Sequence, residues 1–283
     1  PIIASSAASD VYKRQSLGAL RKQLADAAAE ARSGRYGDEQ MENEAVQRLV
    51  DGDWPMEWVS DFAFVSDYPD KAWAEKASPE SSNVLKAIAP VMQASEDGLT
   101  IISPYFVPGE EGTAFLVGIA ADRTVRVLTN SLAANDVAAV HGGYSRSREA
   151  LLAGGVLLYE MKPIGNQDVP YSLRGSTGGS LHTKAFSVDD DRLFVGSYNL
   201  DPRSTSLNCE QGVMVASEAL TREFEGLFDR QTAGTYSWQV TLEEDGDLGW
   251  SDGRETFEKD PEASAGRRFQ AWLARLLRID SQL

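Results

Sequence analysis

Residues 181–210 read LHTKAFSVDDDRLFVGSYNLDPRSTSLNCE, and the rest of the chain is best understood from them. His182 and Lys184 are two positions apart in a strand-like run, so their side chains point to the same face. Ser197 and Asn199 repeat this spacing after a second strand-like run and also share a face. If the two runs pair as a hairpin, an imidazole, an ammonium, a hydroxyl and a carboxamide meet at its open end.

These four groups suit a phosphate diester. Lys184 and Asn199 can donate hydrogen bonds to the non-bridging oxygens, where charge builds up in the transition state. The imidazole of His182 can attack phosphorus or protonate a leaving alkoxide. We expect no metal and no other cofactor, because the chain has two histidines, one cysteine and no ligand-like cluster of them.

The full pattern is H-x-K-x4-D-x6-G-S-x-N, which fills every fixed position of the HKD motif. The chain therefore resembles the phospholipase D superfamily. The resemblance implies catalytic roles for His182, Lys184, Asp189, Ser197, Asn199 and Glu210. Asp189 could instead orient the hairpin or pair with Arg203. Glu210 is expected to hold one nitrogen of an active-site histidine, either His182 or the histidine of a partner lobe.

Apolar periodicity predicts an α/β fold, a mixed sheet flanked by helices. Strands are expected at 99–103, 124–129, 156–161, 181–188, 192–195 and 211–216, and helices at 110–121, 136–153 and 217–232. This order is also the order of one phospholipase D lobe. The resemblance thus extends over residues 98–235, which we expect to form a catalytic lobe with one HKD motif.

The regions on either side of the expected catalytic lobe are predicted to form separate segments. Residues 1–97 are predicted to connect two lobes, with helices at 16–34 and 81–95 and an irregular polar stretch at 35–79. Residues 236–283 are predicted to form a hairpin and an amphipathic helix at 263–279. The Gly- and Ser-rich residues 165–179 are expected to form a mobile loop beside the site.

The final helix allows two interpretations. Its apolar residues recur at helical spacing and are accompanied by four arginines: Phe269, Trp272, Leu273, Leu276 and Leu277, with Arg267, Arg268, Arg275 and Arg278. Such a helix could lie in a membrane interface. It could equally dock its apolar stripe on its own domain and leave the arginines in water.

Composition limits the function further. The net charge of −16 argues against broad nucleic-acid binding, which needs basic surface. A single cysteine excludes an internal disulfide and fits a reducing compartment. No apolar run approaches the roughly 18–20 residues that cross a bilayer, and the first residues do not read as a signal peptide.

A phospholipase D site requires two HKD motifs, and this chain has one. The other histidine, His141, is followed by two glycines and could be structural or could contact substrate. The missing half is expected either in a lobe upstream of Pro1 or in a second copy of the chain. We prefer the upstream lobe, in which case His182 is the general acid and base of the second motif.

Three runs are similar to bacterial cardiolipin synthases and fit the C-type: Ser103–Pro108, Thr129–Asp136 and Asn199–Ser204. This similarity implies a phosphatidyltransferase that acts on phospholipid. It also implies a peripheral enzyme at the cytoplasmic face of the bacterial inner membrane. Tyr105 and Arg203 are expected to contact the substrate. The alternatives are a phosphodiesterase that hydrolyses phospholipid or nucleic acid, as a one-motif dimer or otherwise, and an inactive half.

Overall fold

The computed structural model describes residues 22, 47–48, 51–53, 56–73, 78–163 and 180–277. The expected loop at 165–179, and the expected helix at 16–34 apart from residue 22, lie outside the described residues. The chain divides into two compact units, residues 1–58 and 59–283, and strand β1 and all described elements after it belong to the second.

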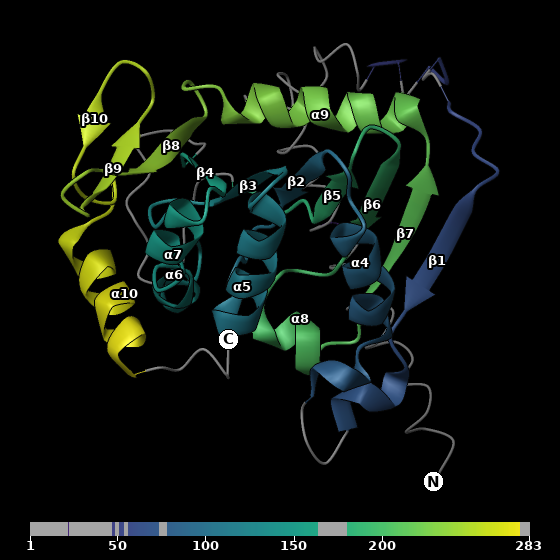
Figure 1. Ribbon diagram of the computed structural model, residues 1–283, viewed down its shortest axis with the longest axis horizontal. Coiled ribbons are helices and arrows are strands. Elements are labelled where there is room, and N and C mark those ends of the chain that lie inside the picture. Colours follow the sequence, from purple (N-terminus) through teal and green to yellow (C-terminus); the bar gives the residue numbers. More distant parts are fainter. Residues whose placement is uncertain are drawn as a thin grey trace, which may run out of the picture. The chain divides into compact units, whose positions relative to one another are not determined.

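The described strands form one mixed sheet in the order β1-β7-β6-β5-β2-β3-β4-β8-β9-β10 (Figure 1). Strands β2, β3 and β4 are parallel neighbours, and all other neighbours are antiparallel. The bounds are β1 Phe62–Ser66, β2 Gly98–Ile102, β3 Thr124–Asn130, β4 Leu157–Met161, β5 Ala185–Val188, β6 Arg192–Gly196, β7 Gln211–Ala216, β8 Ser237–Leu242, β9 Leu248–Ser251 and β10 Thr256–Phe257.

The helices join and cover these strands. Their bounds are α4 Asn83–Gln93, α5 Gly109–Ala120, α6 Ala138–Tyr144, α7 Arg148–Ala153, α8 Pro202–Ser206, α9 Glu218–Thr232 and α10 Ala265–Leu277, with short 3-10 turns η1 Pro69–Trp73 and η2 Pro79–Ser81. None of the helices in the described ranges combines the length and the low polarity needed to cross a membrane.

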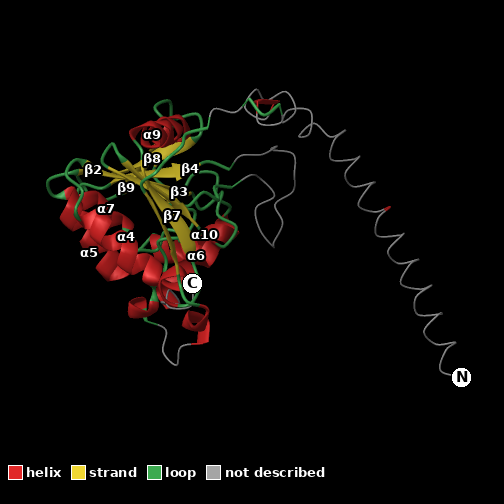
Figure 2. Ribbon diagram, turned by 90° about the vertical axis from the view of Figure 1, so that its right-hand side faces the viewer, coloured by secondary structure: helices red, strands yellow, loops and turns green. Residues whose placement is uncertain are grey.

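Helices cover both faces of the sheet. Helix α9 lies on one face, and α4, α5 and α7 lie on the other (Figure 2). Neighbouring residues of a strand point to opposite faces, so Ile101 packs toward α4 and α5 while Ile102 packs toward α9. In the same way, Val127 packs toward α4 and α5 while Leu128 packs toward α9. The predicted α/β fold and its element order are confirmed.

Two local expectations differ from the structure. The helix expected at 136–153 is two helices, α6 and α7, because Gly142 and Gly143 lower helix propensity and the Ser145 hydroxyl donates to the Gly142 carbonyl, 2.8 Å away. The stretch expected to be irregular, 35–79, contains strand β1, which pairs antiparallel with β7 at the edge of the sheet.

The compact unit is also larger than the expected lobe. Strand β1 and helix α4 come from the predicted connector 1–97, and β8, β9 and β10 come from the predicted C-terminal segment 236–283. All of them belong to the same sheet or pack on it. The expected limits at 97/98 and 235/236 therefore do not coincide with the limits of the unit, which begins at Val59.

The contact between α6 and α10 is close enough to require glycine. A Cβ added at Gly142 would lie 2.6 Å from the Ala271 carbonyl oxygen and 2.9 Å from the Ala274 Cβ. We expect Gly142→Ala to lower the free energy of unfolding by about 1–3 kcal/mol, because α10 must shift to make room. Urea unfolding measures this change.

Gly118→Ala is the matched control. Gly118 lies within α5, and an added Cβ meets nothing within 4 Å. This substitution should be neutral or stabilise by up to about 1 kcal/mol through helix propensity. Equal effects at both positions would mean that α10 does not pack on α6 as described.

Candidate active site

The residues of the HKD motif, with the exception of Asp189, lie at the edge of the sheet formed by one set of strand ends. Parallel strands β2, β3 and β4 all end there, while β5 begins there, β6 ends there and β7 begins there. In open α/β sheets, ligands bind outside the carboxyl ends of the parallel strands. The loops at this edge carry Tyr105, His182, Lys184, Asn199 and Glu210.

His182 and Lys184 are neighbours on one face, as their spacing predicted. The Lys184 Nζ lies 3.4 Å from His182 Nδ1 and donates to the His182 carbonyl oxygen at 2.8 Å. Regular pairing starts later than expected, at Ala185, although the Gly196 N–H still reaches the Lys184 carbonyl at 3.0 Å. His182 is exposed and Lys184 is half-buried, so the imidazole is accessible to a substrate.

Ser197 and Glu210 form the base of the site. The Ser197 hydroxyl donates to one Glu210 carboxylate oxygen, and the Ser204 hydroxyl donates to the other at 2.9 Å. The Gln211 N–H donates in turn to Ser197 Oγ at 3.0 Å. Glu210 is buried and, among the described contacts, it bonds these two serines and not His182. Its expected bond to a histidine is thus not made by His182 in this chain.

Asn199 is buried in the segment after β6. Its N–H donates to Ser204 Oγ at 3.2 Å, whereas its side-chain oxygen is buried without a hydrogen-bond partner in the described part of the chain. A buried amide oxygen without a partner is costly. The oxygen and nitrogen of such an amide exchange places on a 180° rotation, so Asn199 can present a donor where this oxygen now lies.

The surroundings of Lys184 are acidic. Partial burial lowers the pKa of Lys184, and the carboxylates of Glu210, Asp201 and Asp136 act against this shift. Tyr105 donates its hydroxyl to Asp136 at 2.8 Å, and burial together with this carboxylate raises the pKa of Tyr105. Burial also raises the pKa of Asp201, and bonds from Ser204 partly offset the rise. One ammonium among three carboxylates does not by itself favour a phosphate.

Asp189 does not lie with the other motif residues. It occupies the turn between β5 and β6, at the opposite end of β5 from Lys184, with a left-handed φ of 52°. Its carboxylate accepts from the backbone N–H groups of Glu96, Asp97 and Gly98, the bond from Gly98 measuring 3.0 Å. Among the described contacts Asp189 bonds these backbone N–H groups and not Arg203, which fits the interpretation that it orients the hairpin.

Arg203 is exposed on α8, beside Asp201, which caps that helix by accepting from the Ser204 N–H at 2.7 Å. Tyr105 lies across the site on the loop after β2. The Arg203 side chain is exposed and that of Tyr105 is partly exposed. Their contact with substrate stays a prediction.

Asn130, at the end of β3, positions the motif and was not singled out from the sequence. Its side-chain oxygen accepts from the Leu181 N–H at 3.0 Å, and its Nδ2 donates to the Leu181 carbonyl at 3.1 Å. This two-bond clamp holds the residue that precedes His182. The signal in the sequence was a polar residue at the carboxyl end of a buried strand.

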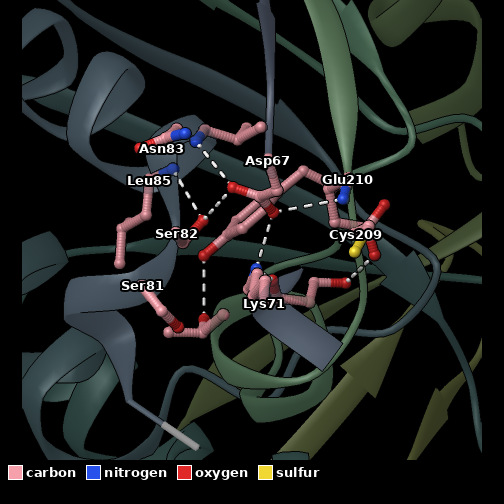
Figure 3. A network of polar contacts seen from close by, with 12 residues as sticks. Asp67, Lys71, Ser81, Ser82, Asn83, Leu85, Cys209 and Glu210 are labelled. Carbon is pink, nitrogen blue, oxygen red and sulfur yellow. Dashed lines mark hydrogen bonds and ion pairs between the residues drawn. The ribbon is translucent and has the colours of Figure 1, made fainter. Parts of the chain in front are cut away.

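A buried ion pair lies beside Glu210 and bonds its backbone (Figure 3). The Lys71 Nζ lies 2.6 Å from Asp67 Oδ2, and both side chains are fully buried. Asp67 also accepts from the Glu210 N–H at 3.1 Å, while Lys71 donates to the Ser204 carbonyl at 2.8 Å. Ser82 Oγ, 3.1 Å away, donates to the second oxygen of Asp67. Asp67, Lys71 and Ser82 precede residue 98, and the sequence interpretation missed them because it treated that region as a connector.

His141 is structural. It is 1% exposed on α6, its Nε2 lies 3.0 Å from Asp260, and Arg148 contacts the same nitrogen. His141, Glu160 and Asp260 offer ligand atoms within 4.8 Å of one another, as a metal site would. The Arg148 guanidinium, however, lies 2.8 Å from Asp260 and 3.3 Å from Glu160, so a cation already occupies their centre.

An apolar pocket of about 640 Å³ lies between α4, α5 and the segment leading into α8. Tyr198 and Leu200 line it from either side of Asn199, whereas His182, Lys184 and Asn199 do not line it. Alternation along this segment explains the difference, because Ser197 and Asn199 point to the sheet edge and Tyr198 and Leu200 point away. The pocket is therefore separate from the side chains of the HKD motif.

The mixed sheet and its HKD hairpin define a phospholipase D-like lobe. Residues 88–232, half of the chain, match the family described as cardiolipin synthase, phospholipase D-like domain, and the chain belongs to this family. Cardiolipin synthase C of Escherichia coli is 37% identical over 259 residues, which are 89% of this chain and 54% of that protein. Cardiolipin synthase A of Pseudomonas aeruginosa is 31% identical over 144 residues, 50% of this chain and 26% of that protein.

The chain thus spans about half of the first of these relatives and less of the second. Among solved structures, phosphatidylserine synthase of Haemophilus influenzae is 14% identical with a TM-score of 0.47, and the match covers 77% of this chain and 44% of that one.

Asp189→Asn tests the role of the turn. Asparagine tolerates the left-handed backbone, so the substitution removes the charge and keeps the turn. We expect the free energy of unfolding at pH 7 to fall by about 1–3 kcal/mol, because charge-assisted bonds to three N–H groups are weakened. Asp190→Asn, one residue on and exposed, should change it by less than about 0.5 kcal/mol.

The stability difference between wild type and Asp189→Asn should depend on pH. Burial alone would raise the pKa of Asp189, but the three N–H bonds outweigh it and the pKa lies below its usual value. A lowered pKa stabilises the fold above the unfolded value of about 3.9 and loses this contribution as pH falls through the folded value. The difference between wild type and Asp189→Asn should therefore be full at pH 7 and shrink below about pH 4. A difference independent of pH would contradict the assignment.

Proposed function

We propose that this chain supplies one HKD half-site of a phosphatidyltransferase that forms cardiolipin from phospholipids. The observation that carries the proposal is the pairing of His182 and Lys184, 3.4 Å apart, at the sheet edge where Asn199 also lies. The family assignment and the names of the relatives, cardiolipin synthases C and A, supply the substrate class.

Two steps result from this chemistry. A histidine of the complementary half attacks phosphorus, a P–N bond forms, the ester P–O bond breaks, and His182 gives its proton to the leaving alkoxide. His182 then takes the proton of an acceptor lipid hydroxyl, which attacks phosphorus and breaks the P–N bond. Lys184 and Asn199 donate to the non-bridging oxygens in both transition states.

The complementary half is proposed to come from an upstream lobe or from a second copy of the chain. The need for it is electrostatic as well as chemical. Lys184 faces the carboxylates of Glu210, Asp201 and Asp136, so a phosphate gains little net attraction from this half alone. A second motif would bring another lysine and the nucleophilic histidine to the same edge. It would also offer an imidazole for Glu210.

We further propose that the complete enzyme acts as a peripheral protein at the cytoplasmic face of the inner membrane. Its substrates would be anionic or zwitterionic phospholipids, and no nucleic acid is expected in the site. The net charge of the chain, −16, supports the absence of a nucleic-acid substrate, because binding a polyanion needs basic surface.

Substitutions at the site test the assignment in an enzyme that contains both halves. His182→Ala should reduce turnover to background, and Lys184→Ala and Asn199→Ala should each reduce it by about 10²- to 10³-fold, because each removes a donor to the transition state. Thr183→Ala, between the two motif residues and on the opposite face, should keep wild-type turnover. The assay follows conversion of phosphatidylglycerol vesicles to cardiolipin by mass spectrometry.

The products decide between the candidate activities. Cardiolipin as the main product supports the transferase, whereas phosphatidic acid alone would identify a hydrolase. Nicking of plasmid DNA in EDTA would identify a metal-independent nuclease. Wild-type turnover in Lys184→Ala would contradict the phosphate clamp.

The isolated 283-residue chain should be nearly inactive as a monomer, because the proposed reaction needs the histidine of a second HKD motif beside His182. Turnover measured against protein concentration tests this, with the oligomeric state determined by light scattering. Activity that rises with the square of the concentration would indicate a second copy as the partner. Robust turnover in proportion to the concentration of monomer would contradict the half-site.

A further inference from the structure

Helix α10 is attached to its domain by its small residues. Ala271 and Ala274 are 6% and 5% exposed and pack on α6 at Gly142, where no side chain would fit between the helices. Figure 1 shows α10 alongside α6 at the end of the sheet away from β1. Of the two interpretations of this helix, docking on its own domain is observed, but through the small residues and not through the large apolar stripe.

The opposite side of α10 exposes the large apolar residues. This outer face consists of Phe269, Trp272, Leu273, Leu276 and Leu277. Phe269 is 59% exposed, Leu276 is 62% exposed, and the Phe269 and Trp272 rings stack with centroids 5.8 Å apart. The spacing i, i+3, i+4, i+7, i+8 makes the face continuous. Contiguous exposed apolar surface of this kind marks a site of interaction.

The charge of α10 differs in sign from that of the chain. The helix contains three arginines and no acidic residue, whereas the whole chain carries −16. Arg275 is half exposed, with its only described ion pair, to Glu149, at 3.9 Å. Aromatic and leucine residues flanked by arginines are the composition of helices that lie in the interface of anionic membranes.

The position of α10 relates it to the candidate site. Arg267 donates to the backbone carbonyls of Leu132 and Asn135, the first at 3.0 Å. The next residue, Asp136, accepts the hydroxyl of Tyr105 at the sheet edge. The loop of residues 132–136 therefore contacts both α10 and Tyr105 of the candidate site.

We propose that the outer face of α10 inserts into the headgroup region of an anionic phospholipid bilayer and holds the HKD edge against it. The proposal rests on the proposed function, because a lipid substrate places a bilayer at the site. Charge complementarity favours an anionic lipid surface over a second copy. A two-fold contact would set α10 against itself and bring like charges together.

Vesicle binding tests this with the 283-residue chain. We expect the chain to co-sediment with phosphatidylglycerol vesicles, less with phosphatidylcholine vesicles, and less as salt rises. Phe269→Ser combined with Leu276→Ser should lower the partition coefficient by at least about 10-fold, since two apolar anchors are lost. In a Trp272→Phe variant, the emission change caused by brominated lipid should largely disappear.

Phe62→Ser combined with Phe64→Ser is the matched control. These residues lie on β1, at the other end of the sheet, and are 61% and 60% exposed. The control pair should bind vesicles like wild type. The proposal would be overturned if both double variants lost vesicle binding equally, or if neither lost it. It would also be overturned if the protein formed a dimer without lipid and the α10 double variant dissociated that dimer.

The outcome is separable from that of the proposed function. Vesicle binding that depends on α10, in a protein whose complete enzyme makes no cardiolipin, would support the inference and refute the activity. Cardiolipin synthesis by an enzyme whose vesicle binding is unchanged in the α10 double variant would support the activity and refute the inference.

Discussion

Strand β5 is held at both ends by side chains that hydrogen-bond to backbone, and the geometry of the site depends on this. At one end the Asn130 amide makes two bonds to Leu181, and at the other the Asp189 carboxylate takes three N–H groups that precede and begin β2. The strand cannot slide by one residue without breaking both sets. A one-residue slip would turn His182 and Lys184 to the opposite face.

Short-range geometry was the part of the site that the sequence could predict. Side chains two apart on a strand share a face, so His182 with Lys184 could be placed without knowledge of the fold. The clamps could not be predicted in the same way, since the bonds of Asp189 reach backbone more than 90 positions away. The Asp67–Lys71 pair could not be predicted for a further reason. Strand β1, which precedes it, is short and at the edge of the sheet, and both of its phenylalanines are exposed.

Helix α10 shows a different limit. Its hydrophobic period was evident, but periodicity does not say which stripe faces the protein. Ala271 and Ala274 form the face that packs on the protein, because these alanines and Gly142 opposite them let α10 approach α6 more closely than the large apolar side chains would. The split of 136–153 into α6 and α7 has a related cause, since Gly142, which permits the close approach of α10, also lowers the helix propensity of this segment.

Glu210 joins the catalytic edge to a part of the chain that lies outside the family match. Its backbone carbonyl accepts from the Asp67 N–H at 2.8 Å, and its N–H donates to the Asp67 carboxylate. The match begins at residue 88. A recombinant fragment trimmed to the matched limits would retain every residue of the motif and lose β1, Asp67 and Lys71, so the Glu210 N–H and the Ser204 carbonyl would lose their buried partners. The smallest unit that is recognisable in the sequence is therefore smaller than the smallest unit that can hold the site in place.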